Sequence, residues 1–457
     1  MTVSTIFMLV IFMTVLAFVT ARVRALSLSR QKRLHSLPRY YGYYAAACSL
    51  LPGLFVLLLW LLFGSYIIDG IVIESLQQSM QITSDVEAKL ALNRVKIVFA
   101  TGSTLENNPT IIAAADQYAG LLYKGKMAAM VFALGLGLMG IYFANSRITP
   151  DFRARNKYEK ILLVVLAASS ALAVLTTLGI VFSLLFESIQ FFEQVPLLDF
   201  LTGTHWSPQT SLRDDQVASS GSFGALPLFA GTALVSLIAM LVAVPIGLMS
   251  AIYMTQYASK KTRKITKPIL EILAGVPTVV YGFFAALTVA PLFRDIGDAV
   301  GIPVDSHSAL AAGAVMGIMI IPFVSSLSDD ALSAVPKSLK EGSLALGATP
   351  SETISKVILP AALPGVIGAI LLAASRAIGE TMIVVMAAGM QANLTADPTQ
   401  SVTTVTVQIV KLLTGDQEFD SAKTLSAFAL GLVLFIATLI LNIFAQKTVR
   451  KYREAYD

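Results

Sequence analysis

The chain is built from long apolar runs separated by short polar segments. Each run is at least 17 residues long, and a helix of that length can cross a hydrocarbon core of about 30 Å. A membrane β-barrel would instead alternate apolar and polar residues over segments of about ten. The pattern therefore predicts an all-α, polytopic helical membrane protein. We expect nine spans, at about residues 4–20, 43–68, 127–145, 160–186, 225–256, 269–291, 308–326, 364–389 and 424–445.

Composition agrees with a membrane protein and narrows its chemistry. Hydrophobic residues make up 56% of the chain and charged residues only 13%, against about 25% charged in soluble domains. The single cysteine, Cys48, lies in an apolar run, which excludes a disulfide framework and a cysteine metal site. The net charge of +5 comes from basic residues beside the spans, so it indicates contact with the lipid bilayer and not with nucleic acid.

Basic residues fall unevenly on the two sets of alternate loops. One set holds 23 of the 33 lysines and arginines, and the other holds 8. Because basic loops stay on the cytoplasmic side of a membrane, we expect the first set inside, the N-terminus in the periplasm and the C-terminus inside. The first set consists of residues 21–39, 146–160, 257–268, 327–363 and 446–457.

The N-terminal third allows two interpretations at its start. Residues 1–20 could be a signal peptide, but a signal peptide begins with basic residues, whereas Arg22 and Arg24 follow this run. We therefore favour a retained span. The outside segment 69–125 has apolar residues at helical spacing and a turn at Asn107–Pro109, which predicts two helices that extend the neighbouring spans. We assign it no role beyond a scaffold or partner contact.

Two stretches resemble functional motifs without completing them. Residues 120–126 copy most of a Walker A loop, but Met127 replaces the required serine or threonine. His205 stands alone among scattered acids in the loop 187–222, so a solvated loop explains it better than a metal or catalytic site. We expect no ATP site, no enzyme site, no metal and no cofactor in this chain.

The best-defined polar segment is Glu341–Pro360, between the seventh and eighth spans. Gly347 is a helix-ending glycine of the kind that takes a positive φ. Thr349, Pro350 and Glu352 form a capping box with proline at the first helical position. The pattern predicts helix, sharp turn, helix, with the closing proline as the end of the second helix. On the cytoplasmic side, such a hairpin could bind a partner protein.

Glycine and proline mark the later spans as well. Gly313 and Gly317 are spaced as a small-x-x-x-small face, which favours close packing of two helices. Pro245 and Gly247 predict a break within the fifth span. Gly275, Pro277 and Gly282 predict a break within the sixth span, and Pro291 predicts its end.

Arg376 and Glu380 are charged residues inside the eighth apolar run. Twelve residues separate Arg376 from Pro364, which puts the arginine roughly 18 Å along the span, near the bilayer middle. A charge there costs about 2.5–3.5 kcal/mol, so we expect it to be retained for a reason. The i, i+4 spacing places both side chains on one helix face. There they could pair only to lock helices together, or they could line a substrate pathway.

The chemistry of the pair favours an anionic substrate. Arginine's planar fork matches phosphate oxygens two at a time. Glu380 could neutralise Arg376 in an empty site, or accept a hydrogen bond from hydrogen phosphate. Thr381, Ser375 and Tyr281 are weaker candidates for the lining, because each is better explained as a helix contact or as part of a cavity wall.

The hairpin resembles the EAA loop of ATP-binding-cassette (ABC) importer permeases. The spacing is carried by Glu341, Gly347, Leu359 and Pro360, with Gly342 and Ser343 where alanines are usual and Val357 where isoleucine is usual. The hairpin and three further stretches together resemble the phosphate-transport permeases PstC and, less closely, PstA. These stretches are Phe223–Pro227, Glu271–Gly282 and Arg376–Thr381. The resemblance covers residues 160–457, and residues 1–159 have no recognised counterpart.

This resemblance implies a type I permease core of six helices over 160–457, with a coupling loop at 327–363, after an extension of about three helices over 1–159. It implies a bacterial inner-membrane subunit of an ATP-driven phosphate importer. Its partners would be a PstA-like sister permease, a PstB-like ATPase dimer and a PstS-like periplasmic binding protein. Arg376 and Glu380 would bind inorganic phosphate. The ATPase contact would be formed by Glu341, Gly342, Ser343, Gly347, Thr349, Leu359 and Pro360.

Two other classes of function stay open. An ion-coupled secondary transporter would work without an ATPase and would show an internal repeat between its halves, which is not visible in the sequence. A membrane enzyme or a sensor scaffold would need a catalytic constellation near one interface. Within the permease class, the loop run Thr204–Pro208 favours PstC over the sister PstA.

Overall fold

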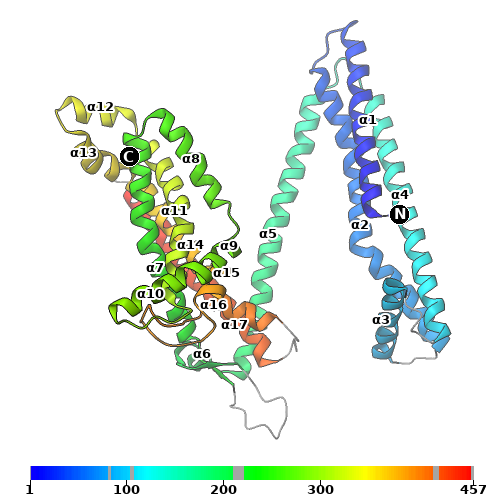
Figure 1. The fold of residues 1–457 in the computed structure, drawn as a ribbon. Coiled ribbons are helices and arrows are strands. Elements are labelled where there is room, and N and C mark those ends of the chain that lie inside the picture. Colours follow the sequence, from blue (N-terminus) through cyan, green and yellow to red (C-terminus); the bar gives the residue numbers. More distant parts are fainter. Residues whose placement is uncertain (1, 81–83, 103–107, 209–220, 415–420, 454–457) are drawn as a thin grey trace. The chain divides into compact units, whose positions relative to one another are not determined.

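The computed structural model describes residues 2–80, 84–102, 108–208, 221–414 and 421–453, and nearly all of its secondary structure is helical (Figure 1). Nine helical segments in these ranges are long and apolar enough to span a membrane, and each overlaps one expected run. The all-α class is therefore confirmed. Two compact units, 1–175 and 176–457, meet inside helix α5 (Ala154–Gln194). The predicted domain boundary at residue 160 stays a prediction.

Unit 1 is a helical bundle in which α2 packs against α1 and α4. Within its described residues, 69–80, 84–102 and 108–125, the outside segment contains one separate helix, α3, and the extended ends of α2 and α4. Lys96 Nζ on α3 lies 2.7 Å from Asp69 Oδ2 on α2. Residues 120–126 are helical, so they form no phosphate-binding loop. The helices are α1 (Val3–Ser29), α2 (Pro38–Met80), α3 (Asp85–Thr101), α4 (Pro109–Ser146) and the first part of α5.

Unit 2 is organised around α11 (Ala309–Ser333), which contacts α7, α8, α14 and α15. The end of α5 leads into α6 (Leu197–Thr202) and a two-stranded antiparallel sheet of β1 (Trp206–Ser207) and β2 (Ser222–Phe223). The remaining elements are α7 (Leu226–Ile252), η1 (Tyr253–Tyr257), α8 (Lys260–Ala274), α9 (Thr278–Phe284), η2 (Ala285–Val289), α10 (Ala290–Val300), α12 (Lys337–Ala345), α13 (Pro350–Thr353), η3 (Ile354–Ile358), α14 (Leu359–Ile378), α15 (Met382–Ala387), α16 (Val405–Leu413) and α17 (Ala422–Arg453).

The small-x-x-x-small face on α11 lies directly against α7. A Cβ atom added to Gly313 would meet Ile238 Cβ at 2.7 Å, and one added to Gly317 would meet Val242 Cβ at 2.7 Å. Contacts this short do not occur in real packing, so only glycine permits the observed approach of the two helices. The predicted packing role of this face is confirmed.

Four predicted breaks are absent: α7 runs through Pro245 and α9 runs through Gly282, while Pro291 and Pro360 stand at the start of helices. The helix α7 runs through Pro245 and continues into η1, while Pro291 and Pro360 each stand in the first turn of a helix that directly follows η2 or η3. A proline in a first helical turn needs no backbone donor, and a π turn shifts the hydrogen-bond register by one residue. The expected stops at Pro291 and Pro360 are therefore wrong. The break at Gly275–Pro277 is present, between α8 and α9.

The polar hairpin and the sheet lie at opposite ends of unit 2 (Figure 1). α12 and α13 are at one end, with the start of α8 beside them, while α6 and α10 are at the other. The core between these ends is formed by small and branched apolar residues of α7, α11, α14 and α15. A long apolar body with one polar hairpin end is the arrangement expected for a membrane subunit with a docking loop.

Candidate functional site

Arg376 lies in the last turn of α14 and contacts α11. Its Nη2 atom is 3.8 Å from Met319 Sδ, and its Cζ atom is 5.6 Å from the centroid of the Phe323 ring. An arginine over an aromatic face gains a cation–π attraction without using its hydrogen-bond donors on a carboxylate. The side chain is exposed. Within the described residues no carboxylate lies within ion-pair distance of it, so its donors remain open to an anion.

The predicted pairing of Arg376 with Glu380 on one helix face is wrong. α14 ends at Ile378, so the i, i+4 geometry of a continuous helix is lost. The Glu380 carboxylate instead turns back to the next helix, where its Oε1 accepts a hydrogen bond of 3.1 Å from the Met382 amide at the start of α15. The hydroxyl of Thr406 also donates to the Glu380 carbonyl. Glu380 therefore stabilises the break that follows Arg376.

The three weaker lining candidates have separate local roles. Ser375 donates a 2.9 Å hydrogen bond to Asn442 Oδ1 and so joins α14 to α17. The Tyr281 hydroxyl donates to the Leu273 carbonyl across the break between α8 and α9. The Thr381 hydroxyl donates to the nearby Gly379 carbonyl at 3.5 Å. The structure therefore places Glu380 and Thr381 just beyond the helix that carries Arg376, and Tyr281 and Ser375 at helix contacts.

The hairpin has the predicted shape. Gly347 has a φ of 88°, and Thr349 and Glu352 form the complete capping box. The Ser343 hydroxyl lies 2.9 Å from that of Thr353 and holds α12 against the second helix. Leu346 at the turn is 91% exposed, which is unusual for a large apolar side chain and makes the turn suitable for a protein contact. Of the remaining predicted contact residues, Glu341 and Gly342 are exposed, whereas Leu359 and Pro360 are half-buried.

Sequence reasoning missed a buried carboxylate at the base of the hairpin. Asp329 on α11 is 1% exposed and is bound by two cations from α8. Arg263 Nη2 lies 2.9 Å from both carboxylate oxygens, Lys267 Nζ lies 3.0 Å from Oδ2, and the Thr255 hydroxyl donates to Oδ1 at 2.8 Å. The hydrogen bond to Asp329 raises the pKa of Lys267, so this lysine stays charged. The cluster ties three helices together where the hairpin begins.

The sequence contained a weak signal for this cluster. Asp329 and Asp330 follow a long apolar run, and Arg263 and Lys267 are spaced i, i+4 on a basic helix. Complementary charge at two helix ends is compatible with pairing, but it does not identify the partners, because 62 residues separate Lys267 from Asp329.

Two family models match separate parts of the chain. Residues 7–176 match the phosphate ATP-binding cassette transporter family, and residues 243–454 match the binding-protein-dependent transport system inner membrane component family. The first match supplies a counterpart for the N-terminal region, which sequence reasoning lacked.

Curated relatives and a solved structure extend the comparison. A probable ABC transporter permease protein YqgH of Bacillus subtilis is 33% identical over 65% of this chain and 89% of its own length. The phosphate transport system permease protein PstC 1 of Mycobacterium tuberculosis is 33% identical over 56% of this chain and 82% of its own length. One solved structure is a bacterial alginate ABC transporter in complex with a pentasaccharide-bound periplasmic protein. One of its chains is 15% identical to this chain, and the alignment covers 65% of this chain and 98% of that chain with a TM-score of 0.45.

The sequence matches and the architecture agree. The matched regions together overlap all nine candidate spans and include the hairpin. The relative from Bacillus subtilis is matched over 89% of its length. The chain belongs to the inner-membrane component family of binding-protein-dependent transport systems, as a permease of the phosphate ABC transporter type.

Proposed function

We infer that this chain is the membrane-spanning permease subunit of an ATP-driven phosphate importer. The family match and the relatives named for phosphate transport support this function. The observation that carries the substrate assignment is the exposed guanidinium of Arg376, held over Phe323 by α14 and left without a carboxylate partner within the described residues. A planar guanidinium can bind two phosphate oxygens at once.

Arg376 binds the substrate anion in the translocation path, and Glu380 holds the chain in the position that keeps the arginine available. In this arrangement Glu380 accepts from the Met382 amide, so its negative charge is directed at the start of α15. A negative charge near a helix N-terminus is favourable, whereas one beside Arg376 would compete with the substrate. This assignment replaces the neutralising role that the sequence suggested for Glu380.

The hairpin is the ATPase contact, and it lies in the cytoplasm together with the C-terminus. The excess of basic residues on alternate loops supports this orientation. The exposed Leu346 at the turn supports a protein contact there. The N-terminus then lies in the periplasm. The complete importer contains a PstA-like sister permease, two copies of a PstB-like ATPase that hydrolyse ATP, and a PstS-like periplasmic protein that delivers phosphate.

Phosphate uptake by cells that carry Arg376 variants tests the substrate assignment. Arg376→Ala removes the anion-binding group and should abolish uptake at a matched membrane level. Arg376→Lys keeps the charge but loses the planar fork, so it should impair uptake strongly. Glu380→Gln keeps an amide oxygen that can accept from Met382, so it should reduce uptake less than Arg376→Ala does.

A matched control is Arg147→Ala, because Arg147 also lies over a phenylalanine ring, with its Cζ atom 4.1 Å from the centroid of Phe143. This variant should keep normal uptake. Every variant should still copurify with the ATPase, and a secondary transporter would copurify with none. Full uptake by Arg376→Ala would show that the arginine is structural and that phosphate binds elsewhere.

A further inference from the structure

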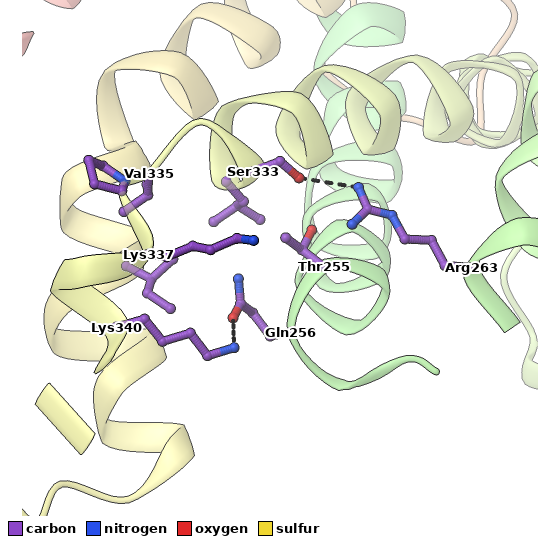
Figure 2. A pocket seen from close by; sticks show the side chains of 10 residues that line it. Thr255, Gln256, Arg263, Ser333, Val335, Lys337 and Lys340 are labelled. Atoms are coloured by element: carbon purple, nitrogen blue, oxygen red, sulfur yellow. Dashed lines mark hydrogen bonds between the residues drawn. The ribbon is translucent and has the colours of Figure 1, made fainter. Parts of the chain in front are cut away.

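A cavity of about 240 Å³ lies between α12 of the hairpin and the segments η1 and α8. One wall is formed by Lys337 and Lys340 of α12, and the other by Thr255 and Gln256 of η1 and Arg263 of α8 (Figure 2). Along α11, the adjoining Ser333 is ten residues beyond Phe323, or about 15 Å. The cavity is therefore separate from the candidate site at Arg376.

Two hydrogen-bond donors that line the cavity, the Gln256 amide nitrogen and the Lys337 ammonium, have no acceptor among the described residues. Lys340 Nζ donates to Gln256 Oε1 at 2.8 Å. Because an ammonium group can only donate, the Gln256 oxygen must face Lys340, and the amide nitrogen of Gln256 faces away from it. In Figure 2 that nitrogen and the Lys337 ammonium point toward the same part of the cavity. Neither of these two nitrogens makes a hydrogen bond or ion pair with a described residue, so both are available to a ligand in the cavity.

Arg263 adds further donor capacity from α8. Its bonds to Asp329 and Ser333 all use Nη2, so within the described residues Nη1 and Nε are not engaged. The single proton of the Thr255 hydroxyl is already engaged, because its oxygen lies 2.6 Å from the Ala251 carbonyl oxygen and 2.8 Å from Asp329 Oδ1. The buried Asp329 thus fixes Arg263 in place without entering the cavity, whose ten lining residues include no aspartate or glutamate.

Converging donors with three basic side chains and no lining acid favour an oxyanion. A carboxylate is planar and presents its oxygens in one direction, whereas a tetrahedral phosphate presents oxygens toward ammonium, amide and guanidinium donors at the same time. We propose that this cavity binds a phosphate group, either inorganic phosphate or the phosphate of an anionic lipid headgroup. The bound phosphate connects the hairpin to η1 and α8.

Direct binding of radiolabelled inorganic phosphate tests the site in the full chain, purified and reconstituted in phosphatidylcholine nanodiscs. All variants carry Arg376→Ala, which removes the other proposed phosphate site and separates this test from the proposed function. The lining variant is Lys337→Gln with Lys340→Gln. The matched control is Lys261→Gln with Lys264→Gln, which removes the same charge from exposed positions of α8 that do not line the cavity. Circular dichroism checks that each variant is folded.

The proposal expects one saturable phosphate site in the parent and the control, and at least tenfold weaker binding in the lining variant. A parallel set in phosphatidylglycerol nanodiscs distinguishes the two sources. If the headgroup is the ligand, phosphatidylglycerol copurifies with the parent and the control but not with the lining variant, and it prevents phosphate binding. If neither phosphate binding nor lipid retention depends on Lys337 and Lys340, the cavity is not a phosphate site and the proposal is wrong.

Discussion

The substitution Asp329→Asn should destabilise unit 2 strongly although it changes hardly any volume. Asparagine keeps one oxygen that can accept from Arg263 or Thr255. Its amide group is a donor, however, and it would face Lys267 or Arg263, which are also donors. The change removes the negative charge that both cations share, with Arg263 at 2.9 Å and Lys267 at 3.0 Å.

The size of the effect follows from the burial of the partners. Removing one member of a fully buried ion pair costs about 3–5 kcal/mol. Here Asp329 is buried, but the side chains of Arg263 and Lys267 are 36% and 32% exposed, so water can solvate the cations left behind. We therefore expect a loss in the lower part of that range or just under it, about 2–3 kcal/mol. For a unit of this size, that corresponds to a fall in Tm of roughly 4–12 °C.

The measurement is thermal unfolding of the purified chain in detergent, followed by circular dichroism. The control is Asp330→Asn at the next position, because Asp330 is 67% exposed and has one 3.4 Å contact with Lys267. It should cost at most about 1 kcal/mol, as exposed pairs do. Equal Tm values for the two variants would refute the reasoning, since they would mean that the buried carboxylate contributes no more than its exposed neighbour.

Three further predictions concern the hairpin, the topology and the helix packing. Gly347→Val forces a branched side chain onto a φ of 88°, so it should uncouple ATP hydrolysis from phosphate uptake while the chain still inserts. In a Cys48→Ala background, an impermeant maleimide added to intact spheroplasts should label a cysteine at Ser84 and not one at Ser338. Gly317→Leu pushes a side chain into α7, where even a Cβ atom would lie 2.7 Å from a neighbouring side chain, and should cost about 1–3 kcal/mol in thermal unfolding.

Each of these predictions has an outcome that would contradict it. Normal uptake and coupling in Gly347→Val would show that the turn geometry does not matter to the ATPase. The reverse labelling pattern would invert the topology and place the hairpin outside the cell. A Tm unchanged by Gly317→Leu would mean that α7 and α11 can separate easily. The control is Gly301→Leu, because a side chain at this position meets no neighbour and tests only the strain of a positive φ.

The sequence predicted those features that short-range patterns determine. Apolar runs located the spans because the bilayer thickness sets their length. The residues at Thr349, Pro350 and Glu352 predicted the hairpin because a capping box closes within one helical turn, and the structure contains it. The helix stop predicted at Pro360 was wrong because a π turn precedes this proline and the helix continues through it. The pattern of residue types does not show the register of backbone hydrogen bonds.

The candidate site was predictable only in part. Arg376 was found because a charge within an apolar run is conspicuous, but its partner was inferred from i, i+4 spacing, and the helix ends before Glu380. Asp329 was missed because its partners, Arg263 and Lys267, belong to a helix distant in the sequence. Tertiary contacts of this kind depend on how helices pack, and no local spacing encodes them.

The π turn η3, which joins the hairpin to α14, contains one residue more than an α-helical turn needs. Because the extra residue is held inside the turn, deletion of a single codon within Ile354–Ile358 would let an α-helical turn form and would keep the hairpin at nearly its present angle about the axis of α14. The same deletion in the α-helical part of α14 would turn the hairpin by about 100°. The π turn is therefore a place where the length of this helix can change by one residue without redirecting the docking surface.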